Sequence, residues 1–405
     1  MKVTAELEWV LLAAFGPQTP DFSGQLDTAL VVSLARTFDL VPRIVSRVGP
    51  GVLEPMLGPG AARDLLEEML ITFGRGEQLH QLSRLLDRTA ASAGIPIAFL
   101  KFSALVLGEH VSTAQRRACD VDVLAPDAEL PRLAEALLRD GWQESRLPGY
   151  EHQLPPFVHP KLGWAELHRH IVGVDIAGRG RFATYEDLEA AGHLLPAPGL
   201  SPLGQIPSRE LLIAHALAHG LAQHGLAPQA YPVFRLAGDL IDLRASVEDS
   251  RTIEQTTAWL SPYLTAGQIE GAIRLASRLQ AGDRSLFSPA AADSQEGILL
   301  RHFVAGILDT AYRDSLRLAE LAFSPSERPP LVAAVARVAH ALFPGREALD
   351  GIYGPATGFW SRTTFRARRV VEMACRLPGY ARAVARHRRR PRGGTTGHPD
   401  EPRIS

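Results

Sequence analysis

Apolar residues in the first quarter of the chain recur every three or four positions, which is the spacing of one face of an α-helix. One such face carries Leu26, Ala29, Leu30, Leu34 and Phe38, and a later one carries Leu79, Leu82, Leu85 and Leu86. Proline and glycine clusters near residues 17–24, 49–51 and 58–60 interrupt this pattern. We therefore expect residues 1–93 to form an N-terminal region of short helices.

The pattern changes at Gly94, after which short apolar runs bounded by turn residues replace the helical spacing. Such runs predict strands, and they occupy residues 95–100, 119–125, 142–147, 153–159 and 163–168. Helical segments are expected between them at 103–109 and 129–140, the second of which ends at Gly141. We expect residues 94–200 to form a mixed α/β core.

From Tyr185 onward the chain again shows helical spacing. Ser208 is a candidate N-cap, because Leu211 and Leu212 supply the first apolar turn after it. Helices are expected at residues 208–225, 234–247, 252–261, 266–280, 294–319, 328–343 and 362–388. The predicted fold class is therefore α+β, with a small mixed-sheet core embedded in a mainly helical protein and a C-terminal helical region over residues 201–388.

Asp120 and Asp122 interrupt an apolar stretch that otherwise predicts a buried strand. Residues two apart on a strand share one face, so we expect the two carboxylates to lie side by side. Two buried like charges repel each other and cost desolvation energy, and a divalent cation relieves both effects. Glu166 lies on a later predicted strand and supplies a third carboxylate. The pattern indicates a Mg²⁺ site suited to phosphate-bearing substrates, and the alternative is a solvated strand end.

Basic residues lie close to the acidic strand. Lys101 directly follows the first predicted strand, and Arg117 comes shortly before the acidic one. Both side chains are suited to phosphate binding, and Arg117, with Arg116 beside it, would offer a guanidinium fork. The alternative for Lys101 and Arg117 is a surface salt bridge. His168 shares a strand face with Glu166, so it either lines the same cleft or packs at the strand end.

Three segments carry a family resemblance. Their sequences are Leu-Lys-Phe-Ser-Ala at 100–104, Arg-Ala-Cys-Asp-Val-Asp-Val-Leu at 117–124 and Ala-Glu-Leu-His at 165–168. Together they resemble the polymerase-beta-like nucleotidyltransferases, and most closely their uncharacterised bacterial branch. Members of that branch show a Leu-Lys-Gly turn, an Arg three residues before an Asp-hydrophobic-Asp strand, and a later Glu-Leu-His strand. The resemblance covers roughly residues 95 to 245.

This resemblance implies a small mixed sheet and the transfer of a nucleoside monophosphate from a nucleoside triphosphate to an acceptor. It implies that Asp120, Asp122 and Glu166 hold Mg²⁺ or Mn²⁺. It also implies that Ser103 contacts a phosphate, a helix N-cap being the alternative. One position departs from the family, because Phe102 stands where a glycine is expected and does not allow the same close backbone approach. A second hypothesis is therefore a catalytically inactive binding protein with the nucleotidyltransferase fold.

Two histidine pairs suggest a third hypothesis. His168 and His170 are two apart on a predicted strand, so they share a face. His215 and His219 are four apart on a predicted helix and also share a face. With the carboxylates, these pairs would make a histidine–carboxylate metal hydrolase site. The alternative for the helical pair is a polar stripe or a pair of buried core histidines.

Composition limits the partners and the location of the protein. The net charge is −1, so no overall field favours nucleic acid or membranes. Residues 361–405 hold twelve Arg against three acidic residues, and we expect residues 389–405 to be a disordered basic tail. This tail offers a contact for nucleic acid, although a solvated helix end is the favoured interpretation. Only two cysteines, an N-terminus unlike a signal peptide and the lack of a run of roughly eighteen apolar residues favour a cytoplasmic protein.

Overall fold

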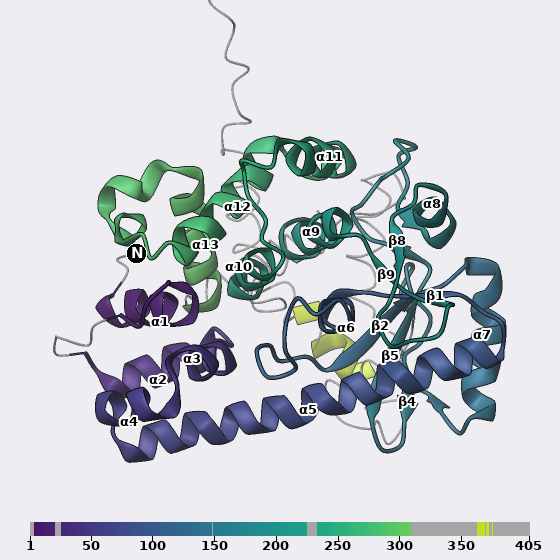
Figure 1. Cartoon of the computed structure of the whole chain (residues 1–405), viewed down its shortest axis with the longest axis horizontal. Coiled ribbons are helices and arrows are strands. Elements are labelled where there is room, and N and C mark those ends of the chain that lie inside the picture. Colours follow the sequence, from purple (N-terminus) through teal and green to yellow (C-terminus); the bar gives the residue numbers. More distant parts are fainter. Residues whose placement is uncertain are drawn as a thin grey trace, which may run out of the picture.

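A mixed β-sheet packed against helices forms one side of the molecule, at the right in Figure 1. The computed structural model describes residues 4–20, 26–147, 149–224, 233–308, 363–368, 370–371 and 375. Within these residues helices predominate and the strands gather into one main sheet. The predicted α+β fold class is therefore confirmed.

The main sheet has seven strands in the order β3-β4-β5-β2-β1-β9-β8. Their bounds are β1 Ile97–Phe99, β2 Asp120–Leu124, β3 Gln143–Glu144, β4 Phe157–His159, β5 Gly163–His168, β8 Leu194–Pro196 and β9 Gly204–Pro207. β2 pairs parallel with β5 and antiparallel with β1, and β1 pairs parallel with β9. A separate two-stranded sheet joins β6 (His170–Ile171) to β7 (Ala183–Thr184). The strand with the paired aspartates, β2, is thus the central strand of the main sheet.

All five strands predicted between Gly94 and His168 are present as β1 to β5, although β1 to β4 are all shorter than predicted. The expectation that the chain is helical from Tyr185 onward is wrong, because β8 and β9 form an antiparallel hairpin after α8 (Tyr185–Ala190). These strands are three and four residues long, and each contains a proline. They are too short to show the apolar alternation by which a strand is detected in a sequence.

The described part of the N-terminal region is helical, and its helices are α1 Ala5–Phe15, α2 Thr28–Thr37, α3 Val41–Val48, α4 Pro50–Leu57 and α5 Pro59–Ser92. α5 is 34 residues long. It runs along the bottom of the molecule, with the other N-terminal helices at one end and the sheet at the other (Figure 1). It buries Leu65 in its first half and Leu79, Leu82 and Leu86 in its second half. A single helix therefore joins the N-terminal helices to the core.

The other helices are α6 Lys101–Leu107, α7 Leu130–Arg139, α9 Arg209–Leu217, α10 Val233–Asp242, α11 Ser250–Leu260, α12 Ala266–Gln280 and α13 Gln295–Leu308. Ser208 Oγ accepts a hydrogen bond from the Leu211 N–H at 3.4 Å, so the predicted N-cap of α9 is confirmed. A π-helical segment, η2 (Ala218–Gln223), continues α9. The helix predicted at 328–343, most of that at 362–388 and the tail at 389–405 lie outside the described residues.

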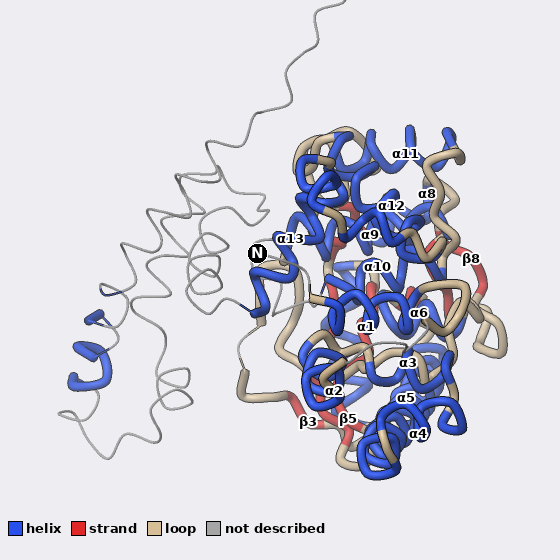
Figure 2. The backbone as a smooth tube through the Cα atoms, turned by 90° about the vertical axis from the view of Figure 1, so that its left-hand side faces the viewer, coloured by secondary structure: helices blue, strands red, loops and turns tan. Residues whose placement is uncertain are grey.

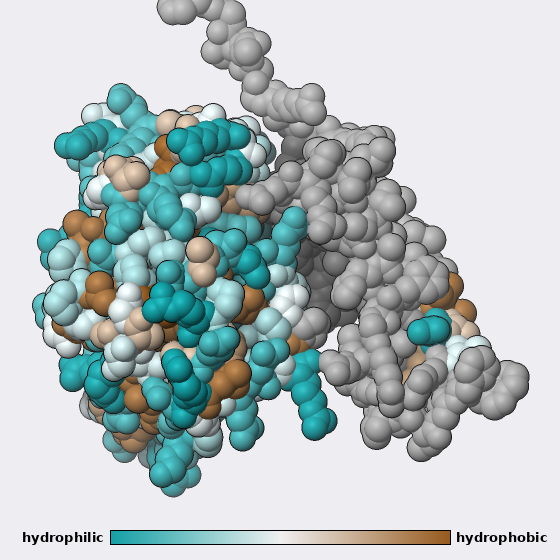
Figure 3. Space-filling model, turned by 90° about the vertical axis from the view of Figure 1, so that its right-hand side faces the viewer, coloured by the Kyte–Doolittle hydropathy of each residue, from teal (hydrophilic) through white to brown (hydrophobic). Residues whose placement is uncertain are grey.

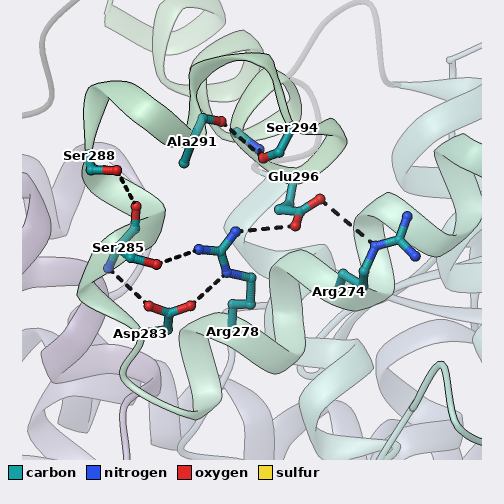
Figure 4. A network of polar contacts seen from close by, with 9 residues as sticks. Arg274, Arg278, Asp283, Ser285, Ser288, Ala291, Ser294 and Glu296 are labelled. Carbon is teal, nitrogen blue, oxygen red and sulfur yellow. Dashed lines mark hydrogen bonds and ion pairs between the residues drawn. The ribbon is translucent and has the colours of Figure 1, made fainter.

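Arg278 on α12 holds the connection between α12 and α13 (Figure 4). Its Nε donates to Asp283 Oδ2 at 2.8 Å, and its Nη2 donates to Ser285 Oγ at 2.8 Å. Its Nη1 donates to Glu296 Oε1 on α13 at 3.2 Å. One guanidinium therefore ties the end of α12, the following 3₁₀ turn (Arg284–Phe287) and the start of α13 together.

The outer surface of the described part is mixed in character. In the view turned by 90°, β8, an end strand of the main sheet, lies at the right-hand side of the described part (Figure 2). On the opposite side, hydrophobic residues are scattered among hydrophilic ones (Figure 3). No helix in the described ranges is both long and apolar enough to cross a lipid bilayer.

Candidate functional site

The acidic residues of β2 and β5 lie side by side. In the parallel register, Asp120 is opposite Trp164 and Asp122 is opposite Glu166. Residues opposite each other on neighbouring strands project from the same face of the sheet, and side chains alternate between faces. His168 follows Glu166 by two residues, so it projects from this face as well. One face of the sheet thus gathers three acids and a histidine from two strands.

The apolar residues between these polar positions fill the opposite face. They are fully buried, and they are Val121, Val123, Ala165 and Leu167. Full burial of a Val or Leu side chain contributes about 1.5–3 kcal/mol. A slip of one residue would move these side chains to the polar face and the acids into the core. Hydrophobic alternation therefore fixes the positions of the acids.

Arg75 of α5 ties together the starts of β2 and β5. Its Nη2 donates to the Cys119 carbonyl at 2.7 Å, and its Nη1 donates to the Leu162 carbonyl at 3.1 Å. Gly163, the first residue of β5, has φ +123°, and a Cβ built there would lie 2.6 Å from Arg75 Nη2. The positive φ favours glycine at this position, and an added Cβ would displace the guanidinium from its place. The helix thereby sets the relative position of the two acidic strands.

Asp122 is the centre of the polar cluster. Its Oδ1 accepts a hydrogen bond from Lys101 Nζ at 2.7 Å and lies 2.9 Å from His168 Nε2. His168 Nε2 is also 3.7 Å from Glu166 Oε2. Asp122 and His168 are buried, whereas the side chains of Glu166 and Lys101 are partly exposed. The cluster is therefore closed on the Asp122 side and open to solvent on the Glu166 side.

The backbone of Lys101 is in a left-handed conformation, with φ +48°. This conformation costs a non-glycine residue of order 1 kcal/mol and is found most often at functional sites. Lys101 is the first residue of α6, and only Leu100 separates it from the end of β1. The chain therefore turns sharply here. The turn directs the ammonium group onto Asp122.

The two aspartates of β2 have opposite electrostatic environments. Burial, and then the charge of Asp122, raises the pKa of Asp120 to about 6. Burial also favours the protonated form of Asp122, but the Lys101 ammonium and the His168 hydrogen bond outweigh it, so the pKa of Asp122 is lowered. Burial lowers the pKa values of Lys101 and His168, but their contacts with Asp122 outweigh it and both pKa values are raised. Asp122 is therefore ionised at neutral pH, whereas Asp120 exchanges its proton near pH 6.

The cluster has a donor set that fits a divalent cation. Asp122, Glu166 and His168 each offer one ligand atom, and these atoms all lie within 4.8 Å of one another. Carboxylate oxygens suit Mg²⁺ and Mn²⁺, and an imidazole nitrogen suits Mn²⁺ and other transition metals. Asp120 is not part of this close group, but its side chain projects from the same face beside Asp122. Partial exposure of Glu166 gives an ion access from solvent.

Ser103 and Arg117 have neighbours other than the residues of the polar cluster. Ser103 lies inside α6, whose N-cap is Leu100, so the N-cap alternative for Ser103 is wrong. Its buried side chain lies beside His80 of α5. Arg117 Nη2 is 2.9 Å from Glu68 Oε1, and its Nε is 3.5 Å from Asp39 Oδ1. The phosphate contacts predicted for these two residues remain predictions, and the geometry brings neither into the Asp122 group.

Phe102 points into the protein core. Its side chain is buried and lies next to α5 residues such as Leu79. Its ring centroid is 5.8 Å from Arg116 Cζ, a cation–π distance. The ring therefore packs beneath α6 and is not placed over the carboxylates.

The helical histidines lie next to Lys101 and not within the metal-binding group. His215 of α9 and His219 of η2 have ring centroids 6.2 Å apart, and both line a small cavity of ≈ 20 Å³ beside Lys101. Burial, and then the charge of Lys101, lowers the pKa of His215 to about 3 and that of His219 well below its usual value. Both histidines are therefore neutral at physiological pH. Arg116 and Asp239 line the same cavity, and Arg116 Nη1 lies 3.0 Å from Asp239 Oδ1.

The four-histidine arrangement of a hydrolase is not gathered in one place among the described residues. His168 alone of the four joins the carboxylates in the group of potential metal ligands. His170 lies on β6, with its ring 5.1 Å from that of Phe182. The histidine that stacks on His168 is instead His152, at a centroid distance of 5.6 Å. Sequence reasoning did not single out His152, and its spacing from Tyr150 and Gln153 in a loop shows no periodicity that would have identified it.

Comparison with known proteins identifies a protein family for this chain. A family model described as "Uncharacterised nucleotidyltransferase" matches residues 25–254, which is more than half of the 405-residue chain. The matched segment includes α5, every strand of the main sheet and all residues of the polar cluster. A search of curated proteins found no match, and a search of solved structures found none either.

Proposed function

Because the chain belongs to the uncharacterised nucleotidyltransferase family, we propose that it transfers a nucleoside monophosphate from a nucleoside triphosphate to an acceptor, with Mg²⁺ or Mn²⁺ as cofactor. The observation that carries this proposal is the register of β2 and β5. It places Asp122 opposite Glu166 and brings their oxygens and the His168 nitrogen within 4.8 Å of one another. A hydroxyl or phosphate group is the acceptor class that this chemistry serves.

Asp122, Glu166 and His168 are the residues that would hold the cation, with Asp120 beside them. A bound divalent ion neutralises phosphate charge and stabilises the attacking and leaving oxygens of an in-line displacement. Lys101 extends its ammonium group to the same place and is suited to contact a phosphate oxygen. These side chains project from rigid strands and a helix start, which keeps the site in position before substrate binds.

Asp120 is the residue best suited to accept the proton of an acceptor hydroxyl. A general base works best when its pKa is close to the pH at which the enzyme operates. In the absence of a bound cation, burial, and then the charge of Asp122, raises the pKa of Asp120 to about 6, so Asp120 is largely ionised at neutral pH. Glu166, partly exposed on the neighbouring strand, is the alternative base.

Calorimetric titration of each nucleoside triphosphate in the presence of Mg²⁺ tests the proposal. Asp122→Asn and Glu166→Gln remove ligand charge at nearly constant volume, and Glu144→Gln on the exposed strand β3 is a matched control. Loss of a residue that supports a metal ligand typically lowers affinity roughly 10- to 100-fold. We expect both site variants to lose more nucleotide affinity than this. The control should bind as the unsubstituted chain does. Equal heats for the chain and Asp122→Asn, or no heat for either, would argue against nucleotide transfer.

A second candidate function, nucleotide binding without transfer, is favoured by Phe102. This residue stands at the glycine position of the family turn, and Lys101 before it already pairs with Asp122. A binding protein of this kind would hold ATP without a divalent ion, with the Lys101 ammonium and no metal ion at Asp122. Titration of ATP in Mg²⁺ and again in EDTA separates the two functions. Loss of affinity in EDTA supports the transferase, and unchanged affinity supports the binding protein.

A further inference from the structure

A row of stacked rings leads from solvent to the polar cluster. The rings of Tyr150 and His152 are 5.8 Å apart and nearly parallel, with an interplanar angle of 12°. The rings of His152 and His168 are 5.6 Å apart at 28°. Since His168 contacts Asp122 directly, the row ends on the centre of the candidate site.

Tyr150, at the outer end of this row, presents a large ring to solvent. It is 68% exposed, although it is held in a fixed position on the ring behind it. An exposed aromatic ring with one face supported and the other free is the arrangement on which planar ring systems stack. The centroid separations along the row are 5.8 Å and 5.6 Å, so the Tyr150 ring lies at most their sum from the His168 ring. One nucleotide is of this size.

The loop that carries Tyr150 is ordered by specific contacts. Gln153, which is buried, forms isolated β-bridges with both Tyr150 and His168. The Arg169 N–H donates to the His152 carbonyl at 2.8 Å, which ties the loop to the end of β5. A Cβ at Gly149 would lie 2.8 Å from the Gln153 carbonyl oxygen, so the turn is too tight for a side chain there. These contacts fix the backbone of the loop, and the Tyr150 ring rests on that of His152.

His152 is suited to support the Tyr150 ring because its own ring lies between two others. It is nearly parallel to Tyr150 on one side and stacks on His168 on the other. It therefore acts as a flat spacer between the exposed tyrosine and the polar cluster.

We infer that Tyr150, supported by His152, is the stacking site for the nucleobase of the nucleoside triphosphate. This inference rests on the proposed function, because it assigns one end of the same substrate. The triphosphate lies at the Asp122 group, and the base lies against the outer face of the Tyr150 ring. Stacking of this kind tolerates any base, since every base has a π-face. The site therefore distinguishes nucleotides from simple polyphosphates more strongly than it distinguishes one base from another.

The test compares a ligand that has a base with one that lacks it. Mg²⁺-ATP and Mg²⁺-tripolyphosphate are titrated by calorimetry into the unsubstituted chain and into Tyr150→Ala and Tyr150→Phe. Leu195→Ala is the control, because Leu195 is also exposed but lies on the far edge strand β8. We expect Tyr150→Ala to weaken ATP binding roughly 10- to 100-fold and to leave tripolyphosphate binding unchanged. Tyr150→Phe and Leu195→Ala should bind both ligands as the unsubstituted chain does.

Trp164 is a second exposed ring on which the base could stack, so the test includes it as the alternative to Tyr150. It is 38% exposed and projects beside Asp120, at the other end of the acidic row from His168. Weaker ATP binding in Trp164→Ala, with no change in Tyr150→Ala, would overturn the inference and leave the proposed function intact. Equal loss of ATP and tripolyphosphate binding in Tyr150→Ala would also overturn it, since the loss would not depend on a base. If the unsubstituted chain binds neither ligand, the inference and the proposed function both fail.

Discussion

The ammonium nitrogen of Lys101 lies 2.7 Å from Oδ1 of Asp122, so the most buried acid of the site already has a cation of the chain beside it. Lys101→Met would leave that carboxylate without its strongest partner. Removing one member of a buried ion pair typically costs about 3–5 kcal/mol, and the partial exposure of Lys101 places the expected loss near the lower end. Chemical denaturation in EDTA measures this loss as a fall in the free energy of unfolding.

A divalent cation should replace the missing charge in Lys101→Met. We expect Mn²⁺ to raise the melting temperature of this variant more than that of the unsubstituted chain, because binding to the folded state alone is stabilising. Lys161→Met, at an exposed position after β4, controls for the loss of a lysine. An equal Mn²⁺ effect in all three proteins would contradict the idea that Lys101 and the ion compensate the same carboxylate.

Asp120 should make the free energy of unfolding depend on pH. Burial, and then the charge of Asp122, raises its pKa from 3.8 to about 6 in the folded protein, so the folded state binds this proton more tightly than the unfolded state. The resulting stabilisation is fully present below pH 3.8 and is lost as the pH rises through about 6. In Asp120→Asn this decline should disappear. The variant should then exceed the unsubstituted chain in stability by about 1–3 kcal/mol at pH 7.5 in EDTA.

The comparison that isolates Asp120 is the difference between the two pH profiles. Groups that do not interact with Asp120 contribute equally to both profiles and cancel in this difference. The difference therefore reports Asp120 together with the charges that interact with it, including those of Asp122, Lys101 and His168. Chemical denaturation at intervals from pH 4 to pH 8 supplies the two curves. Parallel curves over this range would show that Asp120 has an ordinary pKa in the folded state, and its role as a general base would lose its support.

The acidic strands were predictable because they follow a local rule. Alternation of apolar residues with Asp120, Asp122 and Glu166 is visible over a few positions, and it determines which face each side chain occupies. The bounds predicted for the strand at 163–168 are those of β5. Hydrophobic burial acts at each of these positions, so the sequence contains the information needed to place them.

The partners of the basic residues were not predictable in the same way. Arg117 contacts Asp39 and Glu68, which are separated from it by many residues and belong to the N-terminal helical region. No periodicity within one segment encodes such a contact. Ser103 does not fill the N-cap role that was the alternative to its predicted phosphate contact, because α6 begins two residues earlier, at Lys101. That start requires a lysine with positive φ, a conformation that its residue type does not favour.

Arg278→Met should loosen the connection between α12 and α13. The guanidinium donates to Asp283, Ser285 and Glu296, and its side chain is only 24% exposed (Figure 4). Loss of these bonds should lower the free energy of unfolding by about 1–2 kcal/mol. Arg63→Met is the control, because Arg63 is a helical arginine of α5 that is 72% exposed and whose Nε lies 3.9 Å from Glu67 Oε1. Similar small losses in both variants, measured by denaturation, would show that the network does not stabilise the fold.

Arg75 and Gly163 should be energetically coupled, because a Cβ at position 163 would lie 2.6 Å from Arg75 Nη2. Arg75→Met removes the hydrogen bonds to the Cys119 and Leu162 carbonyls and should cost about 1–3 kcal/mol. Gly163→Ala should cost about 2–3 kcal/mol from its φ of +123° alone, and more where the guanidinium is present.

The double variant separates the backbone strain from the steric contact. In the Arg75→Met background the guanidinium is gone, so Gly163→Ala should cost about 1 kcal/mol less than it does in the unsubstituted chain. Denaturation of the four proteins gives the coupling energy directly. Additive losses would mean that the alanine meets no guanidinium. In that case Arg75 does not lie against the start of β5, and the proposal that α5 sets the relative position of the two acidic strands would be wrong.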